Sequence, residues 1–180
     1  YTGGTNLNGG VLEVPANTNT ALGTGTLTFA GGTCRALGPV SLNNPVVVSA
    51  GGGVIDTSDD TINLTGIVSG TGQLTTLGHG NVVFTGNNTY SGGTIIQNTV
   101  EVSSNGALGT GVFTLDGGTL KITNNVNLGS QAIAVTATGS AIDTGAFTLT
   151  TSGAISVPAN QIFRKNGSCT FDWSGSGAAF

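Results

Sequence analysis

The chain has 180 residues, of which only 7% are charged and 32 are glycine, and its formal net charge is −4 at pH 7. An ordinary soluble domain has about 25% charged residues, so the surface is expected to be neutral and polar, while the recurring Val, Ile, Leu and Thr exclude a disordered chain. The four Lys and Arg residues are scattered, which excludes a basic nucleic-acid-binding patch, and no apolar run approaches the roughly 20 residues of a membrane-spanning helix.

Short segments in which apolar and polar residues alternate recur along the whole chain. In chain order, clear examples are residues 26–29, 100–102, 120–122, 133–135 and 147–149. Each is bounded by Gly, Asn or Ser, which is the signal for strands and turns. Because no window has apolar residues at helical spacing, the pattern predicts an all-β chain.

Apolar residues also recur at a step of twenty residues. They are Leu22, Leu42, Ile62, Val82, Val102, Ile122, Ile142 and Ile162. A coil of about 20 residues that stacks on the next at roughly 4.8 Å is typical of a β-solenoid. The sequence therefore predicts a parallel β-helix of roughly eight coils of about 20–22 residues.

An internal repeat gives a second estimate of the coil. YTGGT at 1–5 matches YSGGT at 90–94, and ALGTGTLTFAGGT at 21–33 matches 107–119 at nine of thirteen positions. The offsets of 89 and 86 residues fit four coils of about 22 residues, so the twenty-residue series is expected to join different columns of one core. We predict a single β-solenoid domain, 1–180, made of two homologous copies at about 1–89 and 90–180.

Residues 72–120, which span the boundary between the two copies, carry a specific combination of turn motifs. They contain a Gly-x-Gly turn at Gly78–Gly80, NTYSGGT at Asn88–Thr94, ALGTG, and GGTL at Gly117–Leu120. This combination resembles the passenger-associated transport repeat, or autotransporter-associated β-strand repeat, of bacterial autotransporter passenger domains. Two positions depart from that pattern, since Thr76 replaces a common Lys and Cys34 of the first copy stands where the second has Leu120.

The resemblance implies a right-handed parallel β-helix that is secreted or displayed on the bacterial cell surface. It would form part of the stalk of an adhesin-like passenger, and the membrane-embedded barrel of such proteins is absent from this chain. The chain also lacks a signal peptide and an initiator Met, so we expect a processed or excised piece.

Glycine is expected at the sharp corners of each coil, because it adopts positive φ without a steric penalty. Tyr1 and Tyr90 are expected to pack at equivalent corners, in a stacking column, and the alternative is an aromatic platform that binds a sugar. The residues assigned to turns and to the repeat are Tyr1, Gly3, Gly4, Gly31, Gly32, Gly78, Gly80, Tyr90, Gly92, Gly93, Gly117 and Gly118.

Candidate catalytic residues are few. His79, the one histidine, lies between two glycines, and no nucleophile or orienting acid is spaced for it. Asp56, Asp59 and Asp60 form the densest acidic group, for which a solvated corner is favoured over calcium binding or catalysis. We expect no catalytic residue, no metal and no cofactor. The alternative is a carbohydrate-active β-helix enzyme, similar to polysaccharide lyases or hydrolases, or a glycan-binding module.

The two cysteines are both expected to face the core. Cys34 and Cys169 would lie about six layers, or roughly 29 Å, apart, whereas a disulfide needs Cα atoms within roughly 7 Å. An intrachain bridge is therefore not expected, and a bridge between molecules remains open.

The two ends of the chain resemble the two sides of the internal junction before Tyr90. The chain is then either a segment of a longer array or a subunit that stacks head to tail, with end contacts from Tyr1, Phe171, Trp173 and Phe180. In a third possibility, Phe171 and Trp173 plug the last coil of a monomer.

The function expected from the sequence is that of an extracellular structural or adhesive β-solenoid, non-enzymatic and able to form filaments. Its partners would be a second copy and a host-surface or glycan ligand. Nucleic acid is not expected as a partner, nor is membrane insertion by this segment.

Overall fold

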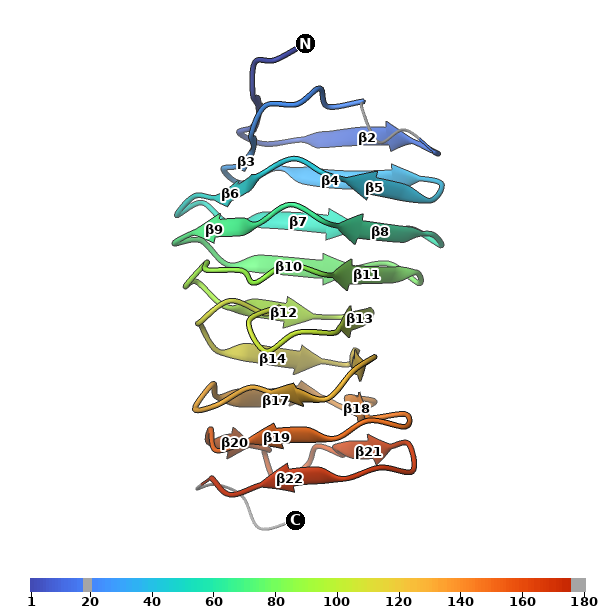
Figure 1. Ribbon diagram of the computed structural model, residues 1–180, viewed down its shortest axis with the longest axis vertical. Helices are drawn as coiled ribbons and strands as arrows, with labels where there is room; N and C mark the ends of the chain where they lie inside the picture. The colour runs from blue at the N-terminus through green and yellow to red at the C-terminus, as the bar shows by residue number, and fades with distance from the viewer. Residues whose placement is uncertain (18–20, 176–180) are drawn as a thin grey trace.

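The computed structural model describes residues 1–17 and 21–175. In this part of the chain there are twenty-two strands and no helix, so no helix of it spans a membrane. The strands stack in coils from the N-terminal end to the C-terminal end, as Figure 1 shows. The strand pairs in this part of the chain are all parallel, for example β2 with β4 and β19 with β22. These observations confirm the predicted parallel β-solenoid.

Each full coil passes three faces. The first face is one eight-stranded sheet: β2 (Val11–Pro15), β4 (Thr33–Leu37), β7 (Gly53–Asp56), β10 (Leu74–Leu77), β12 (Thr94–Ile96), β14 (Phe113–Asp116), β17 (Ile133–Ala137) and β20 (Ile155–Ser156). The second face is seven-stranded: β5 (Val40–Leu42), β8 (Thr61–Leu64), β11 (Asn81–Phe84), β13 (Thr99–Val102), β15 (Thr119–Ile122), β18 (Ala141–Asp143) and β21 (Arg164–Asn166).

The third face is divided between two sheets. One contains β1 (Thr5–Leu7), β3 (Leu27–Phe29), β6 (Val46–Val48) and β9 (Val68–Gly70), and the other β16 (Val126–Asn127), β19 (Leu149–Thr151) and β22 (Phe171–Trp173). Between β9 and β16 two coils cross this face without a strand, at residues 85–93 and 103–112. Backbone bonds still join them, since the amide of Thr110 donates to the carbonyl of Tyr90 at 2.9 Å.

The core is the inside of the coil, where every second residue of a strand stacks on its counterpart in the next coil. On the second face, Val82, Val100 and Leu120 form one such column, and all are fully buried. Parallel stacking at constant register places like aliphatic side chains in contact and removes their apolar surface from water. The alternation predicted from the sequence thus specifies which side chains face inward.

The twenty-residue series does join different columns, as expected. Ile62 pairs with Val82 in one column, whereas Val102 pairs with Ile122 in another. Ile162, which ends the series, is 56% exposed. Successive strands of the first face are offset by between 19 and 22 residues, as from Ile95 to Thr114 and from Val11 to Thr33.

The two copies of the internal repeat lie on different faces. Leu27–Phe29 is β3 on the third face, while its match Phe113–Leu115 lies in β14 on the first. Four coils from Thr33 lead through the paired strands to Thr114, not to its match Thr119. The interpretation of the offset as four coils of about 22 residues was therefore wrong. The repeated unit is a strand, a corner and a strand, and it fits more than one corner of the coil.

Candidate functional site

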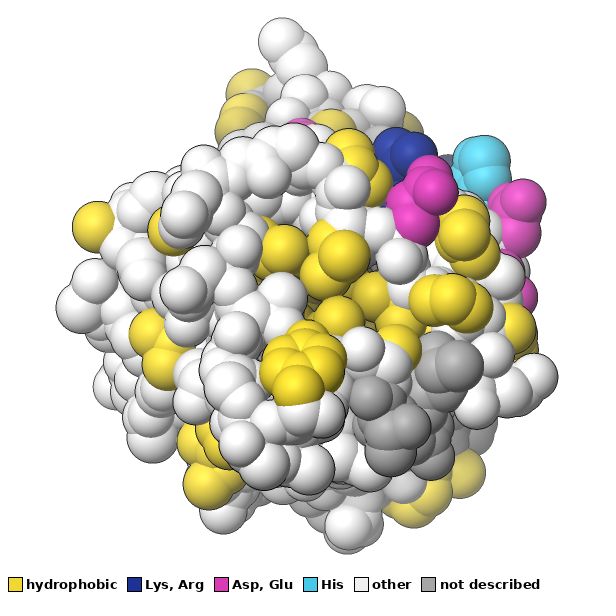
Figure 2. Space-filling model, turned by 90° about the horizontal axis from the view of Figure 1, so that it is seen from above, with side chains coloured by type: hydrophobic (Ala, Val, Ile, Leu, Met, Phe, Trp, Pro, Cys, Tyr) yellow, Lys and Arg dark blue, Asp and Glu magenta, His cyan; other side chains and the backbone are white. Residues whose placement is uncertain are grey.

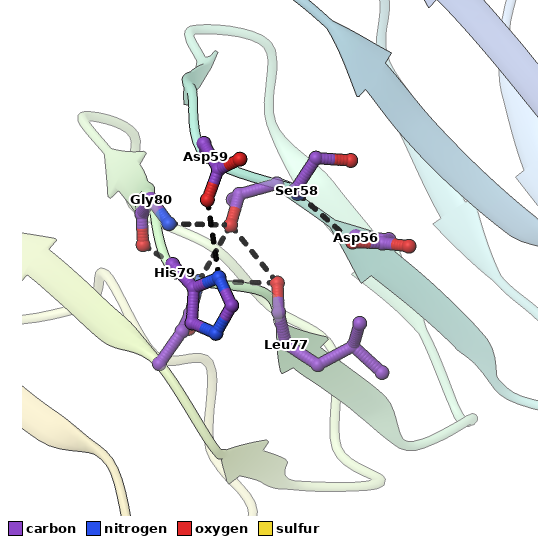
Figure 3. Close-up of polar contacts among 8 residues, drawn as sticks. Asp56, Ser58, Asp59, Leu77, His79 and Gly80 are labelled. Carbon is purple, nitrogen blue, oxygen red and sulfur yellow. Dashed lines mark hydrogen bonds and ion pairs between the residues drawn. The ribbon is translucent and has the colours of Figure 1, made fainter.

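The acidic corner near His79 is held by local bonds. The Asp56 carboxylate accepts bonds from Arg35 Nε at 2.8 Å and from the Ser58 amide at 2.9 Å. Asp59 Oδ1 lies 3.0 Å from His79 Nδ1, and Figure 3 shows the two side chains facing each other. The expectation that no acid is placed to orient His79 was therefore wrong, because stacking brings Asp59 of the preceding coil beside it. Both side chains are more than four-fifths exposed, at 84% and 91%, and such an exposed pair contributes little to stability. No group of three potential metal ligands occurs among the residues that the structure describes.

The glycines of the same turn allow adjacent coils to approach each other. Gly78 has φ +101°, in the left-handed region. At Gly80 a Cβ would lie 1.7 Å from the Asp60 carbonyl oxygen, so a larger residue forces the backbone to move. The remaining assigned glycines divide in the same way. Gly31, Gly93 and Gly117 have positive φ. At Gly4, Gly32, Gly92 and Gly118 an added Cβ would lie less than 3.0 Å from an atom of the neighbouring coil, and Gly3 has neither feature.

Tyr1 and Tyr90 have the same local bonds but different environments. Each hydroxyl bonds the threonine four residues on, at 2.6 Å for Tyr1 and 2.5 Å for Tyr90. Tyr1 is 68% exposed, whereas Tyr90 is fully buried on the third face, and burial raises the pKa of its hydroxyl. The expected stacking column of the two tyrosines was wrong, because the repeat places them on different faces. Tyr90, being buried, offers no aromatic surface to a ligand.

Cys34 faces the core as expected and has no exposed surface. Burial raises the pKa of its thiol to about 11. Cys169 lies on the turn before β22 and is only half-buried, which differs from the expectation that it packs as a buried side chain. Both thiols are free.

The ends of the solenoid expose apolar groups. Figure 2 shows hydrophobic side chains in the hollowed centre of the N-terminal end, inside a rim of polar groups. At the other end Phe171 and Trp173 are half-buried and pack against the core, and Phe171 also meets Phe163 edge to face at 6.4 Å. The fourth residue assigned to an end contact, Phe180, lies outside the described residues.

A groove on the third face runs from the strandless segment 103–112 onto β16 and β19, and we call it the third-face groove. It consists of two cavities of about 340 and 400 Å³ that share Asn105. The residues lining it are all uncharged. They are Asn105, Asn125, Val126, Asn127, Thr148 and Thr150 in the first cavity, and Asn105, Gly109, Thr110, Val112, Leu128, Ser130, Gln131 and Ala132 in the second.

The amide side chains of the groove are held in defined orientations. Asn105 Oδ1 accepts a bond from the Asn127 amide, and Asn127 Oδ1 accepts one from the Gly129 amide, both at 2.8 Å. Asn125 Oδ1 accepts a bond from the Thr148 amide at 2.9 Å. Gln131 is tied in the same way, through Nε2, to the preceding coil, with Nε2–O distances of 2.7 and 3.2 Å. Sequence reasoning placed Asn125 at a corner and assigned none of these side chains to a binding site.

Comparison with known proteins identifies a similar adhesin. The chain is 32% identical over 111 residues to the adhesin BmaC autotransporter of Brucella suis biovar 1 (strain 1330). The match covers 61% of this chain and 3% of that protein, so the chain spans a small fraction of its relative. No family model and no solved structure matches the chain. The similarity supports the resemblance to an autotransporter adhesin that the turn motifs suggested.

Proposed function

We propose that this chain is part of an extracellular adhesive β-solenoid of the autotransporter-passenger type. The observation that carries the proposal is the similarity to an autotransporter adhesin over 111 residues, in a chain whose strands stack into one continuous β-solenoid. The same similarity supports a secreted or cell-surface location. In this function the stacked sheets supply stiffness, and the exposed faces supply surface for contact.

The same proposal assigns the chain a non-enzymatic role. Catalysis by acids and bases requires such groups at a site where a substrate is held. The cavities of the third-face groove are lined by no carboxylate and no histidine. The Asp59–His79 pair, in contrast, is exposed on a corner. A structural or adhesive role therefore fits the described residues better than catalysis does.

Bead adhesion tests the proposed function. Beads coated with the 180-residue chain are expected to adhere to surfaces coated with mucin, with extracellular-matrix protein or with cultured epithelial cells. Beads coated with the heat-unfolded chain serve as the control, because they have the same composition without the solenoid. Equal adhesion of both bead types on all three surfaces would contradict the proposal.

We also propose that copies of the chain associate end to end. The N-terminal end exposes apolar side chains (Figure 2), and the terminal strands of a stack of parallel sheets present unpaired N–H and C=O groups that favour strand addition. Sedimentation velocity and negative-stain microscopy should show rods that lengthen as protein concentration rises. Tyr1→Lys, at a 68% exposed position on that end, should shorten them. Monodisperse monomers at every concentration would rule out this association.

A further inference from the structure

We infer that the third-face groove binds an uncharged, hydroxyl-rich glycan chain. The inference rests on the proposed adhesive function and names the class of ligand and the place where it binds. Its two cavities, of about 340 and 400 Å³, fall within the range of roughly 300–1,000 Å³ that is usual for ligand sites.

One wall of the groove comes from the repeat motif. Residues 103–112, which carry ALGTG, cross the third face without a strand and supply Asn105, Gly109, Thr110 and Val112 to the lining. The backbone there still bonds coil to coil, and Tyr90 fills the interior beneath it with no exposed surface. A hollow held in this way is preformed, so binding does not first have to order a loop.

Hydrogen-bond donors line the first cavity. Asn105, Asn125 and Asn127 are exposed, and each uses Oδ1 to accept a backbone N–H. Among the described residues, their Nδ2 groups have no hydrogen-bond partner. Each amide therefore offers two oriented N–H donors to a ligand. Sugar hydroxyls both accept and donate, so they complement these amides and the hydroxyls of Thr148 and Thr150.

The donors are also arranged periodically along the rod. The backbone N–H of Asn127 donates to Asn105 Oδ1 in the coil before it, and Asn127 is the register partner of Thr150 in the coil after it. Successive coils are about 4.8 Å apart, so the groove presents a polar group at each step. A chain of like sugar units can contact such a series at several points.

The chemistry of the lining excludes other classes of ligand. An anionic glycan or a phosphate is recognised by Arg or Lys, and neither lines the groove. A divalent cation needs several carboxylate or carbonyl oxygens, whereas the asparagine oxygens already accept backbone N–H groups. An apolar ligand would leave the amides desolvated and unpaired. An uncharged polyhydroxyl ligand meets none of these objections.

A titration followed by NMR tests the inference on the whole 180-residue chain. Maltohexaose, cellohexaose, mannohexaose and chitohexaose are added in turn to the ¹⁵N-labelled protein. At least one should shift the resonances of residues 105–112 and 125–132. The double variant Asn105→Asp/Asn127→Asp keeps both Oδ1 acceptors but loses the NH₂ donors, and it should weaken binding about tenfold or more.

Asn43→Asp is the matched control, because Asn43 is also exposed and also uses Oδ1 as an acceptor, from the Thr65 hydroxyl. It should bind as the unchanged chain does. The inference is overturned if no hexaose shifts the groove, if the shifts lie elsewhere, or if Asn43→Asp loses as much affinity. Tighter binding of a sulfated oligosaccharide in the groove would also overturn it.

Bead adhesion separates this inference from the proposed function. If beads coated with the double variant adhere as well as those with the unchanged chain, adhesion stands and the groove is not its site. If a hexaose binds the groove but coated beads do not adhere, the groove inference stands and the adhesive function fails.

Discussion

Cys34 stacks between Leu12 and Ile55 in the inward column of the first face and has no exposed surface. With a pKa of about 11, only about one thiol in a thousand is ionised at pH 8, and the thiolate is the reactive form. We expect a thiol reagent such as DTNB to label Cys169 in the folded protein and to label Cys34 only after unfolding in urea. Mass spectrometry of the labelled peptides measures this, and Cys169→Ser should leave the folded chain unlabelled. Rapid labelling of Cys34 in the folded state would show that the core is open there.

Burial of the same thiol makes stability depend on alkaline pH. The thiol has a pKa of 9.0 when unperturbed and about 11 in the fold, so between these values the unfolded chain releases a proton that the folded chain keeps. The free energy of unfolding should therefore fall as the pH rises from about 9 to about 11, by on the order of 2–3 kcal/mol. Urea unfolding at pH 8 and pH 10 measures the change. Cys34→Ala should flatten it, and an unchanged pH dependence in that variant would assign the effect to other groups.

Buried asparagines bond the backbones of neighbouring coils to each other. Asn88 Nδ2 donates to the Ala107 carbonyl at 2.6 Å, and Asn88 Oδ1 accepts from the Val68 amide at 2.8 Å. Asn88→Ala leaves both backbone groups without these partners, which should lower the free energy of unfolding by about 2–4 kcal/mol. The exposed neighbour is the control, since Asn87→Ala should change the free energy of unfolding by less than about 0.5 kcal/mol. Urea unfolding of both variants decides, and equal effects would contradict the bridging role.

At the level of elements, the distance between adjacent coils determines whether a corner glycine can be replaced by a larger residue. A Cβ at Gly80 would lie 1.7 Å from the Asp60 carbonyl oxygen, whereas at Gly3 it would meet nothing within 4 Å. Gly80→Ala must therefore displace backbone and should lower the free energy of unfolding by about 3 kcal/mol or more. Gly3→Ala, the matched change, should be nearly neutral. Thermal unfolding of the pair compares them, and similar melting temperatures would show that the corner yields without strain.

The sequence was informative wherever a single strand decides the outcome. Alternation placed Val100 and Val102 inside and Glu101 outside, because the side-chain period of a strand is two whatever face it lies on. The faces themselves were not predictable from the internal match. The motif specifies a corner and its flanking strands. An offset of 86–89 residues is consistent both with four coils plus one face and with four longer coils, so the offset alone does not identify the face.

The groove was missed for a related reason. It depends on residues 105–112 and residues 125–132 lying in adjacent coils on one face, which strand-by-strand reasoning does not reveal. A signal was nevertheless present, because NTYSGG and ALGTG lack the alternation found in the surrounding segments. Interrupted alternation in two successive coils indicates a gap in a face of the solenoid.

For the whole molecule, stacking also determines where its few charges lie. On the first face Arg35 Nε lies 2.8 Å from Asp56, and Arg35 Nη1 lies 3.5 Å from Glu13 in the preceding coil. On the second face Lys121 lies 3.1 Å from Glu101, its register partner. Outward side chains of one column are only a strand spacing apart, so like charges in successive coils would repel each other. A solenoid therefore tolerates charges best where opposite charges alternate from coil to coil.

Because each coil bonds only the coils beside it, protection from solvent should be graded along the rod. Hydrogen exchange followed by mass spectrometry should show slow exchange in β7, β10 and β12, which have neighbours on both sides, and faster exchange in β2 and β22 at the ends. If copies associate end to end, raising the protein concentration should slow exchange in β2 and β22 and leave β10 unchanged, since only the terminal strands gain partners. Tyr1→Lys should remove most of that concentration dependence. Terminal strands that exchange at the same rate at every concentration would leave the solenoid intact and exclude its assembly through these ends.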